Sequence, residues 1–318
     1  MCCEVNDMTE EKIVIGENTK YPLNGLLTLP DDITEPVPAV VFVHGSGASN
    51  MDEKVGNLTP FKDLANGLAQ HGIASIRYDK RTFAHGLKML KDKSLEITVG
   101  AETIGDALLA SEMLRKDSRV NAENIFIIGH SMGGMLAPRI DHEGGSYCGL
   151  IIMAGSPRRL EEIMMDQNEE VLRSVKGFVQ WIVKKQVKKF EGMFDGMYQL
   201  SDEEARARKV GGGTTLYYFK EMGEHPAADY LIPSEKPILI LQGEKDVQAT
   251  PEKDFEAYKQ LLAGKSNVKF RLYENLNHAF VPSVYGNIMK AKQEYSVKQH
   301  IPEEVITDIA NWIKEAVH

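Results

Sequence analysis

Runs of apolar residues with the length of a β-strand recur along the chain. They lie at residues 39–43, 73–78, 125–128, 150–154, 238–241 and 268–273. Such uninterrupted runs are typical of strands buried on both faces of a parallel sheet. Between and after them, apolar residues recur at spacings of three and four in the segments 61–70, 98–116, 251–262 and 302–317. That spacing predicts helices, and the alternation predicts an α/β fold with a doubly wound, mostly parallel sheet.

The beginning of the chain has a different pattern. Between residues 13 and 29, polar and apolar residues alternate around Pro22, Leu23, Asn24 and Gly25. Alternation indicates strands with one exposed face, and a turn sequence between two such strands indicates a hairpin. We therefore expect an antiparallel hairpin at the edge of the sheet, centred on these four residues.

From residue 157 to residue 231 no convincing buried strand occurs. The pattern is helical, with one apolar stripe formed by Leu172, Val175, Val179, Ile182, Val183, Val187, Phe190 and Phe194. We interpret the lysines beside the stripe as a solvated face: Lys184, Lys185, Lys188 and Lys189. The glycines at 211–213 predict a flexible joint. We expect residues 157–231 to form a helical cap inserted into an α/β core made of residues 1–156 and 232–318.

Composition and charge limit the partners of the protein. The chain has 318 residues, 42% hydrophobic and 26% charged, which suits one large domain with an insertion. Its net charge of −9 repels phosphate backbones and anionic lipids, so we expect no nucleic-acid and no membrane partner. No apolar run is long enough to span a bilayer, and Cys2, Cys3 and Cys148 are too few for a disulfide framework. We therefore expect a cytoplasmic monomer or homodimer with free thiols.

The apolar run at 125–128 ends in the motif Gly129-His130-Ser131-Met132-Gly133. This GxSxG pattern follows a predicted strand and precedes a predicted helix, which is the context of a nucleophile elbow. In such a turn the flanking backbone comes very close, so the positions near the serine require glycine. We predict that Ser131 is a nucleophile; the alternative is a glycine-rich turn with an incidental serine.

A serine hydroxyl needs a base to accept its proton and an acid to orient that base. In this fold the acid and then the histidine follow the serine along the chain, in loops after late strands. Asp246 and His278 lie in such loops. Glu244 is a rival acid, and we favour Asp246 because the three residues Gly243 to Lys245 allow the chain to turn back over the sheet.

Attack on a carbonyl produces an oxyanion, which backbone N–H groups must stabilise. We expect one donor from Met132, the residue after the nucleophile, at the start of a helix. The loop after residues 39–43 reads His44-Gly45-Ser46-Gly47, and we choose the N–H of Ser46 as the second donor. The alternative is that this loop is only a glycine-rich connection.

The other histidines have no supporting motif. His44 and His130 lie near the predicted site but are poorly placed to reach the hydroxyl of Ser131, so we expect both to have a packing role. No histidine or cysteine spacing indicates a metal site, and no cofactor motif is visible, so we expect neither a metal nor a cofactor.

Five segments together resemble the α/β-hydrolase superfamily. They are HGSG at 44–47, RYDKRT at 77–82, GHSMGG at 129–134, LQGEKDVQAT at 241–250 and LNHAF at 276–280. The chain is most similar to bacterial serine esterases and to dienelactone-hydrolase-like or serine-aminopeptidase-like members, over residues 12–313. The resemblance implies Ser131 as nucleophile, Asp246 and His278 as its partners, and Ser46 and Met132 as oxyanion donors. Relatives often carry proline after HGSG, where this chain has Ala48.

An activated serine without a cofactor favours hydrolysis of carboxylic esters through an acyl-enzyme on Ser131. Several adaptable apolar side chains of the cap are candidates for the pocket wall: Met164, Met165, Met193, Met197, Met222, Phe194, Tyr217 and Tyr218. We therefore expect a small-molecule ester with a small-to-medium apolar or aromatic acyl group. Asp79, Lys80 and Arg81 are expected to form a buried charge network beside the site.

Two other functions stay open. A peptidase or aminopeptidase of the same fold would need a cap carboxylate to hold the amino terminus of its substrate. The candidates are Glu161, Glu162, Asp166, Glu169 and Glu170, although acidic residues are also common at helix starts. A noncatalytic ligand-binding protein with this fold is the second alternative.

Overall fold

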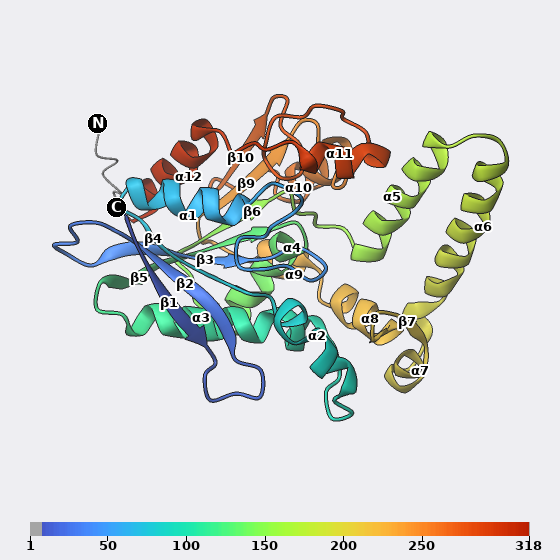
Figure 1. Cartoon of the computed structure of the whole chain (residues 1–318), viewed down its shortest axis with the longest axis horizontal. Helices are drawn as coiled ribbons and strands as arrows, with labels where there is room; N and C mark the ends of the chain where they lie inside the picture. Colours follow the sequence, from blue (N-terminus) through green and yellow to red (C-terminus); the bar gives the residue numbers. More distant parts are fainter. Residues whose placement is uncertain (1–7, 318) are drawn as a thin grey trace.

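A computed structural model describes residues 8–317 and contains a central sheet in the strand order β1-β2-β4-β3-β5-β6-β9-β10 (Figure 1). The strands are β1 (Met8–Ile15), β2 (Leu23–Pro30), β3 (Val37–Val43), β4 (Ala74–Tyr78), β5 (Val120–His130), β6 (Gly149–Met153), β9 (Ile238–Gly243) and β10 (Val268–Tyr273). β2 pairs antiparallel with β1 and β4, and the other strands of this sheet pair in parallel. The predicted parallel sheet with an antiparallel N-terminal hairpin is confirmed. The predictions for Cys2 and Cys3 concern residues outside this range.

Helices cover both faces of the sheet. α1 (Pro60–Gln70) and α12 (Glu303–Ala316) pack on one face, together with Val40 and Phe42 of β3. α3 (Gly105–Lys116), α4 (Met132–Ile140) and α10 (Glu256–Leu261) pack on the other, together with Val41 and Val43. Successive side chains of a strand point to opposite faces, so the apolar run of β3 fills both cores. The remaining elements of the core are α2 (Arg81–Lys91), η1 (Gly100–Ile104), η2 (Asp141–Gly145), η4 (Pro251–Phe255), η5 (Ile288–Lys290) and α11 (Ala291–Ser296).

The turn of the N-terminal hairpin differs from the prediction. It spans residues 16–22, and Gly25 already pairs with Ile13 inside the β1–β2 ladder. Gly16 has a φ of 63°, the left-handed conformation that glycine adopts without steric cost. A Cβ on Gly25 would lie 2.7 Å from the carbonyl oxygen of Arg77. Gly25 therefore serves the close approach of β2 to β4, and not a turn.

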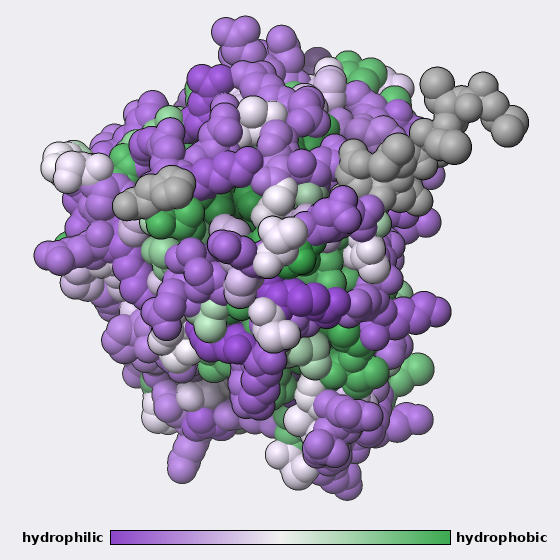
Figure 2. All heavy atoms as spheres, turned by 90° about the vertical axis from the view of Figure 1, so that its left-hand side faces the viewer, coloured by the Kyte–Doolittle hydropathy of each residue, from purple (hydrophilic) through white to green (hydrophobic). Residues whose placement is uncertain are grey.

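Between β6 and β9 the chain leaves the sheet. It forms α5 (Leu160–Ser174), α6 (Gly177–Phe194), η3 (Met197–Gln199), α7 (Asp202–Ala207), β7 (Lys209–Gly211), β8 (Thr214–Thr215), α8 (Leu216–Glu224) and α9 (Ala227–Leu231). α5 and α6 make an antiparallel arm that extends away from the sheet, with α6 outermost (Figure 1). The face of the molecule opposite this arm is mostly hydrophilic, with separate small apolar areas (Figure 2). No helix within residues 8–317 is long and apolar enough to cross a membrane.

Two expectations for this segment are wrong in detail. The single apolar stripe is divided, because α5 and α6 are separate helices, and Val179 and Ile182 are 54% and 38% exposed. The glycines at 211–213 do not form an open joint but close the β7–β8 hairpin, and all three have positive φ.

α2 was not predicted, because Phe83 and Leu87 on this helix are exposed and give no regular buried spacing.

Candidate active site

Ser131 lies in a sharp turn between β5 and α4. Its φ of 54° and ψ of −120° place it in a strained conformation that L-residues seldom adopt. A Cβ on Gly129 would lie 2.2 Å from the carbonyl oxygen of Gly133, and a Cβ on Gly133 would lie 2.1 Å from that of Val43. Both distances are far below van der Waals contact. The turn can therefore close only with glycine at both positions, which is the reason for the motif in the sequence.

The structure brings His278 to Asp246. The Nδ1 atom of His278 is 2.7 Å from Oδ2 of Asp246, and both side chains are buried. Glu244, the rival acid, lies at the surface, where it accepts a hydrogen bond from the N–H of Asn275 and pairs with Lys245. The hydrogen bond to Asp246 assigns the proton of His278 to Nδ1 and leaves Nε2 as an acceptor.

Three further groups hold the carboxylate of Asp246. Nε2 of Gln242 donates to Oδ2 at 2.9 Å, and the N–H groups of Gln248 and Ala249 donate to Oδ1 at 2.7 and 3.1 Å. With the hydrogen bond from His278 included, Oδ2 accepts from two donors and Oδ1 accepts from two donors. Such a carboxylate is fixed in orientation and cannot rotate away from the imidazole.

Ser131 and His278 line the same cavity, of about 510 Å³. Within the described residues His278 hydrogen-bonds to Asp246, but no hydrogen bond joins it to the hydroxyl of Ser131. In the absence of substrate such contacts are often long, and they shorten in the reacting complex. The two side chains also line a smaller cavity of about 210 Å³, so they stand where two cavities meet.

Ser46 and Met132, the two residues expected to bind the oxyanion, both line the larger cavity. The N–H of Met132 belongs to the first turn of α4 and has no carbonyl partner within the helix. In the loop after β3, the N–H of Gly45 is occupied, because it donates to Oε1 of Glu53 at 2.8 Å. The next residue, Ser46, lines both cavities beside Ser131. This arrangement suits an oxyanion placed between the N–H groups of Ser46 and Met132.

A buried ion pair that the sequence did not reveal lies behind the site. Oε2 of Glu53 is 3.0 Å from Nδ1 of His130, although their orientation is not that of a linear hydrogen bond. Nε2 of His130 donates to the carbonyl oxygen of His278 at 2.8 Å. Burial lowers the pKa of His130, but Glu53 and that carbonyl outweigh burial, so the pKa is raised. Glu53 thus connects the Gly45 loop to the His278 loop through His130.

His44 has the packing role expected from the sequence. Its ring lies against Phe61 and Tyr78, and its Nε2 atom is 2.9 Å from the carbonyl oxygen of Asn50. Burial lowers the pKa of His44 to about 4, so the imidazole stays neutral near neutral pH.

A second buried network links α8 to the Gly45 loop. Nζ of Lys80 donates to the carbonyl oxygen of Gly45 at 2.8 Å and pairs with Glu102 at 3.1 Å. The hydroxyl of Tyr218 on α8 donates to the other oxygen of Glu102 at 2.7 Å. Arg81 pairs with Asp106 beside this network. Lys80 and Arg81 are therefore in ion pairs beside the site as expected, whereas Asp79 forms no ion pair within residues 8–317 and accepts a hydrogen bond from the N–H of Met51 at 2.9 Å. Glu102 and Tyr218 are members of the network that the sequence did not indicate.

The larger cavity is mostly apolar. Its apolar wall includes Met89, Leu90, Ile97, Met132, Met135, Leu160, Ile163, Met164 and Phe219. Of the cap residues proposed from the sequence, only Met164 and Tyr218 line it. The other six pack inside the cap or against the core, because methionines and aromatic residues also fill irregular interiors.

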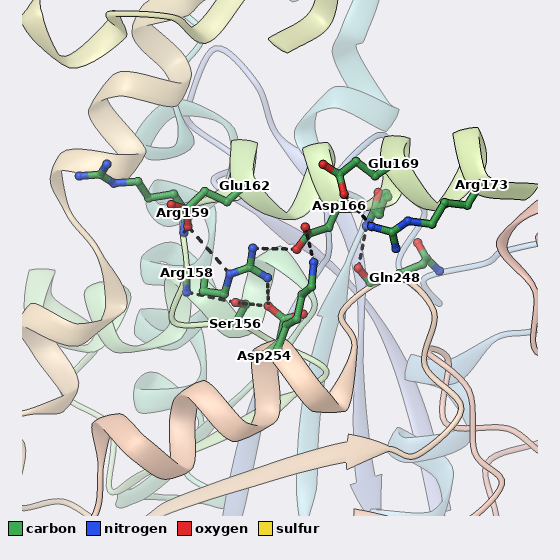
Figure 3. A network of polar contacts seen from close by, with 11 residues as sticks. Ser156, Arg158, Arg159, Glu162, Asp166, Glu169, Arg173, Gln248 and Asp254 are labelled. Atoms are coloured by element: carbon green, nitrogen blue, oxygen red, sulfur yellow. Dashed lines mark hydrogen bonds and ion pairs between the residues drawn. The ribbon is translucent and has the colours of Figure 1, made fainter. Parts of the chain in front are cut away.

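The acidic residues at the start of the cap are engaged in contacts within the protein. Asp166 accepts hydrogen bonds from Arg158 at 2.7 Å and from Lys253 at 2.5 Å (Figure 3). Arg158 also donates to Asp254, which accepts a further hydrogen bond from Ser156. Glu161 accepts from Tyr198, Glu162 from the N–H of Arg159, and Glu169 and Glu170 pair with Arg173. None of the five candidate carboxylates lines the larger cavity.

The described chain offers little for a metal or a disulfide. Within residues 8–317, no three side chains of histidine, cysteine, aspartate or glutamate are grouped as metal ligands. Cys148 is a free thiol whose pKa is raised by burial.

Comparison with known proteins gives relatives over most of the chain. Residues 34–282 match a family described as serine aminopeptidase, S33. The chain is 34% identical to esterase EstD of Thermotoga maritima over 291 residues, 92% of this chain and 65% of that protein. It therefore spans about two thirds of the length of this curated relative.

Solved structures share the fold. Est1E of Butyrivibrio proteoclasticus superposes with a TM-score of 0.57 at 16% identity, covering 96% of this chain and 98% of that one. An esterase of Pyrococcus furiosus gives 0.56 at 15% identity, with 98% and 92% covered. Dienelactone hydrolase of Anabaena variabilis gives 0.55 at 14% identity, with 97% and 98% covered. With the family match covering more than half of its length, the chain belongs to the S33 serine aminopeptidase family and has the α/β-hydrolase fold.

Proposed function

We propose that the protein is a carboxylic ester hydrolase with Ser131 as its nucleophile. The observation that carries this proposal is the position of Ser131 and the His278–Asp246 pair at the junction of two cavities, one large and apolar, one small and more polar. An ester has two parts on either side of its carbonyl, and the two cavities offer a place for each. The larger one takes the acyl group.

The reaction follows from the contacts of the three residues. His278, with its Nδ1–H held by Asp246, accepts the proton of Ser131 at Nε2 while Oγ attacks the ester carbonyl. The oxyanion forms beside the N–H groups of Ser46 and Met132. The imidazolium then gives its proton to the leaving alcohol, and the acyl group stays on Ser131. Water, activated by His278, releases the acid and restores the serine.

Residues 157–231 act in this proposal as the cap, and residues 1–156 and 232–318 as the catalytic core. α5 contributes Leu160, Ile163 and Met164 to the wall of the larger cavity, and α8 contributes Tyr218 and Phe219. These side chains suit a small-to-medium apolar or aromatic acyl group. EstD is named an esterase, and one structure of Est1E holds ferulic acid, so both relatives agree in kind with this proposal.

The family description raises a second candidate, cleavage of an amino-terminal residue from a peptide. Such a substrate carries an ammonium group that a carboxylate must hold. The one carboxylate in the wall of the larger cavity is Glu102, which already pairs with Lys80 and accepts a hydrogen bond from Tyr218. Asp166 and Glu170 line a neighbouring cavity of about 470 Å³ behind Gln248, and they are the place to look if peptides are cleaved.

The test is hydrolysis of p-nitrophenyl esters of increasing acyl length beside aminoacyl p-nitroanilides. We expect turnover of the esters alone, abolished in Ser131→Ala without loss of folding. Turnover of anilides alone would replace the esterase by the aminopeptidase. Activity that survives in Ser131→Ala would refute the mechanism, and inactivity of the wild type on both sets would favour the ligand-binding alternative.

A further inference from the structure

The outer face of α6 combines exposed aromatic and basic side chains. Phe178 and Trp181 are 74% and 53% exposed, and their rings stack with centroids 5.8 Å apart. Nζ of Lys185 lies 3.9 Å from the centroid of the Trp181 ring. Ile182, the residue after Trp181, is also exposed. Large apolar side chains next to lysines on one helix face are typical of helices that lie in a membrane interface.

This helix is rich in lysine, although Glu169 and Glu191 line the same cavity between α5 and α6 as Lys184 and Lys188. Five lysines lie within residues 176–194, with a single acidic residue, Glu191: Lys176, Lys184, Lys185, Lys188 and Lys189. Within the described chain none of the five takes part in an ion pair, whereas lysines such as Lys80 and Lys253 elsewhere do. The whole chain has a net charge of −9, so α6 is a basic region on an acidic protein.

We propose that the outer face of α6 binds an anionic lipid surface. Trp181, Phe178 and Ile182 would enter the headgroup region, and the lysines would contact the lipid phosphates and carboxylates. The binding is peripheral, since α6 lies parallel to the surface. This departs from the expectation of no membrane partner, which counted charge over the whole chain and took these lysines as a solvated face.

The position of α6 explains how a protein with a negative net charge can bind an anionic surface. α6 is the outermost element of the arm (Figure 1), so it reaches a surface before the acidic body of the protein does. Charges further away than the Debye length, about 8 Å at physiological ionic strength, are largely screened. The lysines on α6 therefore decide the interaction with a surface, and the net charge of the body does not.

Charge and exposed apolar side chains distinguish between possible binding partners of this face of α6. A second copy docked with the same face would place two sets of lysines opposite each other, which costs free energy. A nucleic acid would pair with the lysines but would leave the aliphatic Val179 and Ile182 in water, and both are exposed. An anionic lipid surface satisfies both kinds of side chain. It also suits the proposed function, because esters of apolar acids collect in such surfaces.

The chain supplies its own reporter for the test. It has two tryptophans, Trp181 on the outer face of α6 and Trp312, which is buried in the core. A change in emission on addition of vesicles therefore reports Trp181. We expect a blue shift and co-sedimentation with vesicles made of equal parts phosphatidylcholine and phosphatidylserine. Phosphatidylcholine vesicles should give neither, and raised salt should weaken both.

The decisive variants differ only in where charge is removed. The first changes the lysines of α6 to glutamine: Lys184, Lys185, Lys188 and Lys189. The matched control changes four exposed lysines that take part in no ion pair within residues 8–317 and lie elsewhere: Lys12, Lys62, Lys93 and Lys314. Both alter net charge equally. We expect the α6 variant to bind the mixed vesicles roughly a thousandfold more weakly, because four lysines near an anionic surface contribute about 1 kcal/mol each and about 1.4 kcal/mol is a factor of ten. The control should bind nearly as the wild type.

Each other result overturns the proposal. Equal loss in the two variants would show a general charge effect, and no binding of the wild type at low salt would exclude the surface. A dimer in lipid-free solution that the α6 variant converts to monomer would assign the face to a second copy. Vesicle binding is measured without substrate, so it stands or falls separately from the esterase activity.

Discussion

Replacing each partner of the Glu53–His130 pair should destabilise the protein by different amounts. The changes are Glu53→Gln, which keeps the shape of the side chain, and His130→Leu, which removes both ring nitrogens. Both partners are buried, with 8% and 9% of their surface exposed. Each single change leaves the other partner without its counter-ion, but the two partners can respond differently.

The size of each effect follows from what the remaining group can do. After His130→Leu, the carboxylate of Glu53 stays buried with one donor, the N–H of Gly45. Removing one partner of a buried ion pair typically costs about 3–5 kcal/mol. After Glu53→Gln, the imidazole of His130 can release its proton and remain a donor to the carbonyl oxygen of His278. Glu53→Gln should therefore lower the free energy of unfolding by about the value of a hydrogen bond to a charged group, about 1.5–3 kcal/mol.

The contribution of the pair depends on pH in a defined direction. The pKa of His130 is raised above its ordinary 6.5, so its stabilisation is complete below pH 6.5 and is lost as pH rises through the raised pKa. Burial raises the pKa of Glu53, but His130 outweighs burial and the pKa is lowered from 4.5. Its stabilisation is complete above pH 4.5 and is lost at lower pH. The pair therefore stabilises most between about pH 4.5 and 6.5.

Urea unfolding at pH 5.5 and pH 8 measures these differences in free energy. Glu112→Gln is the control, since it breaks an exposed pair with Lys116 and should change little. We expect His130→Leu to cost more than Glu53→Gln at pH 5.5, and the cost of Glu53→Gln to shrink at pH 8. Equal costs, or a cost of Glu53→Gln that grows with pH, would refute the reasoning.

Three further predictions concern the catalytic loops. Gly133→Ala should abolish folding or activity, because its Cβ would lie 2.1 Å from the carbonyl oxygen of Val43; soluble, active protein would contradict this. Asp246→Ala should lower kcat by about 10³–10⁴, whereas Glu244→Ala should leave kcat nearly unchanged, and equal losses would leave the choice of acid unsupported. Burial lowers the pKa of His44 to about 4, so its neutral form stabilises the fold above pH 6.5, and the contribution is lost as pH falls to 4. Between these values the wild type should lose roughly 3 kcal/mol more than His44→Gln in urea unfolding, and parallel curves would contradict the assignment.

The strands and the elbow could be predicted from the sequence because their signals are local. A buried parallel strand is a short apolar run, and the elbow is five consecutive residues with glycine where the backbone closes. Glu53 and Glu102 could not be assigned to the site in this way. Glu53 meets His130, 77 positions later, and Tyr218 meets Glu102 across 116 positions. Charged residues are usually at the surface, so nothing local marks these as buried.

The hairpin turn and the arm show a second limit. Gly25 looks like a turn residue, but its lack of a side chain serves the approach of Arg77 on a strand not adjacent in sequence. The apolar positions of α6 look like a core stripe, but α6 is covered on one side only, by α5 and, at its end, by Phe219 of α8. Periodicity indicates that a helix has an apolar face, and it does not indicate whether the fold covers that face.

Contacts between the cap and the core divide the cap into two parts. Near the cavity, Arg158 pairs with Asp254, Gln167 donates to the carbonyl oxygen of Gln248, and Tyr218 donates to Glu102. These contacts join α5 and α8 to segments that pack beside Asp246 and Gly45, so they tie this part of the cavity wall to the residues that we propose as catalytic. Within residues 8–317, α6 makes no hydrogen bond or ion pair of this kind with the core; it packs mainly on α5 and reaches α8 through Phe194, whose ring centroid lies 5.0 Å from that of Phe219. Changes on the outer face of α6 should therefore alter where the protein binds and leave turnover of a dissolved ester unchanged, whereas changes at Tyr218 or Gln167 should alter turnover itself.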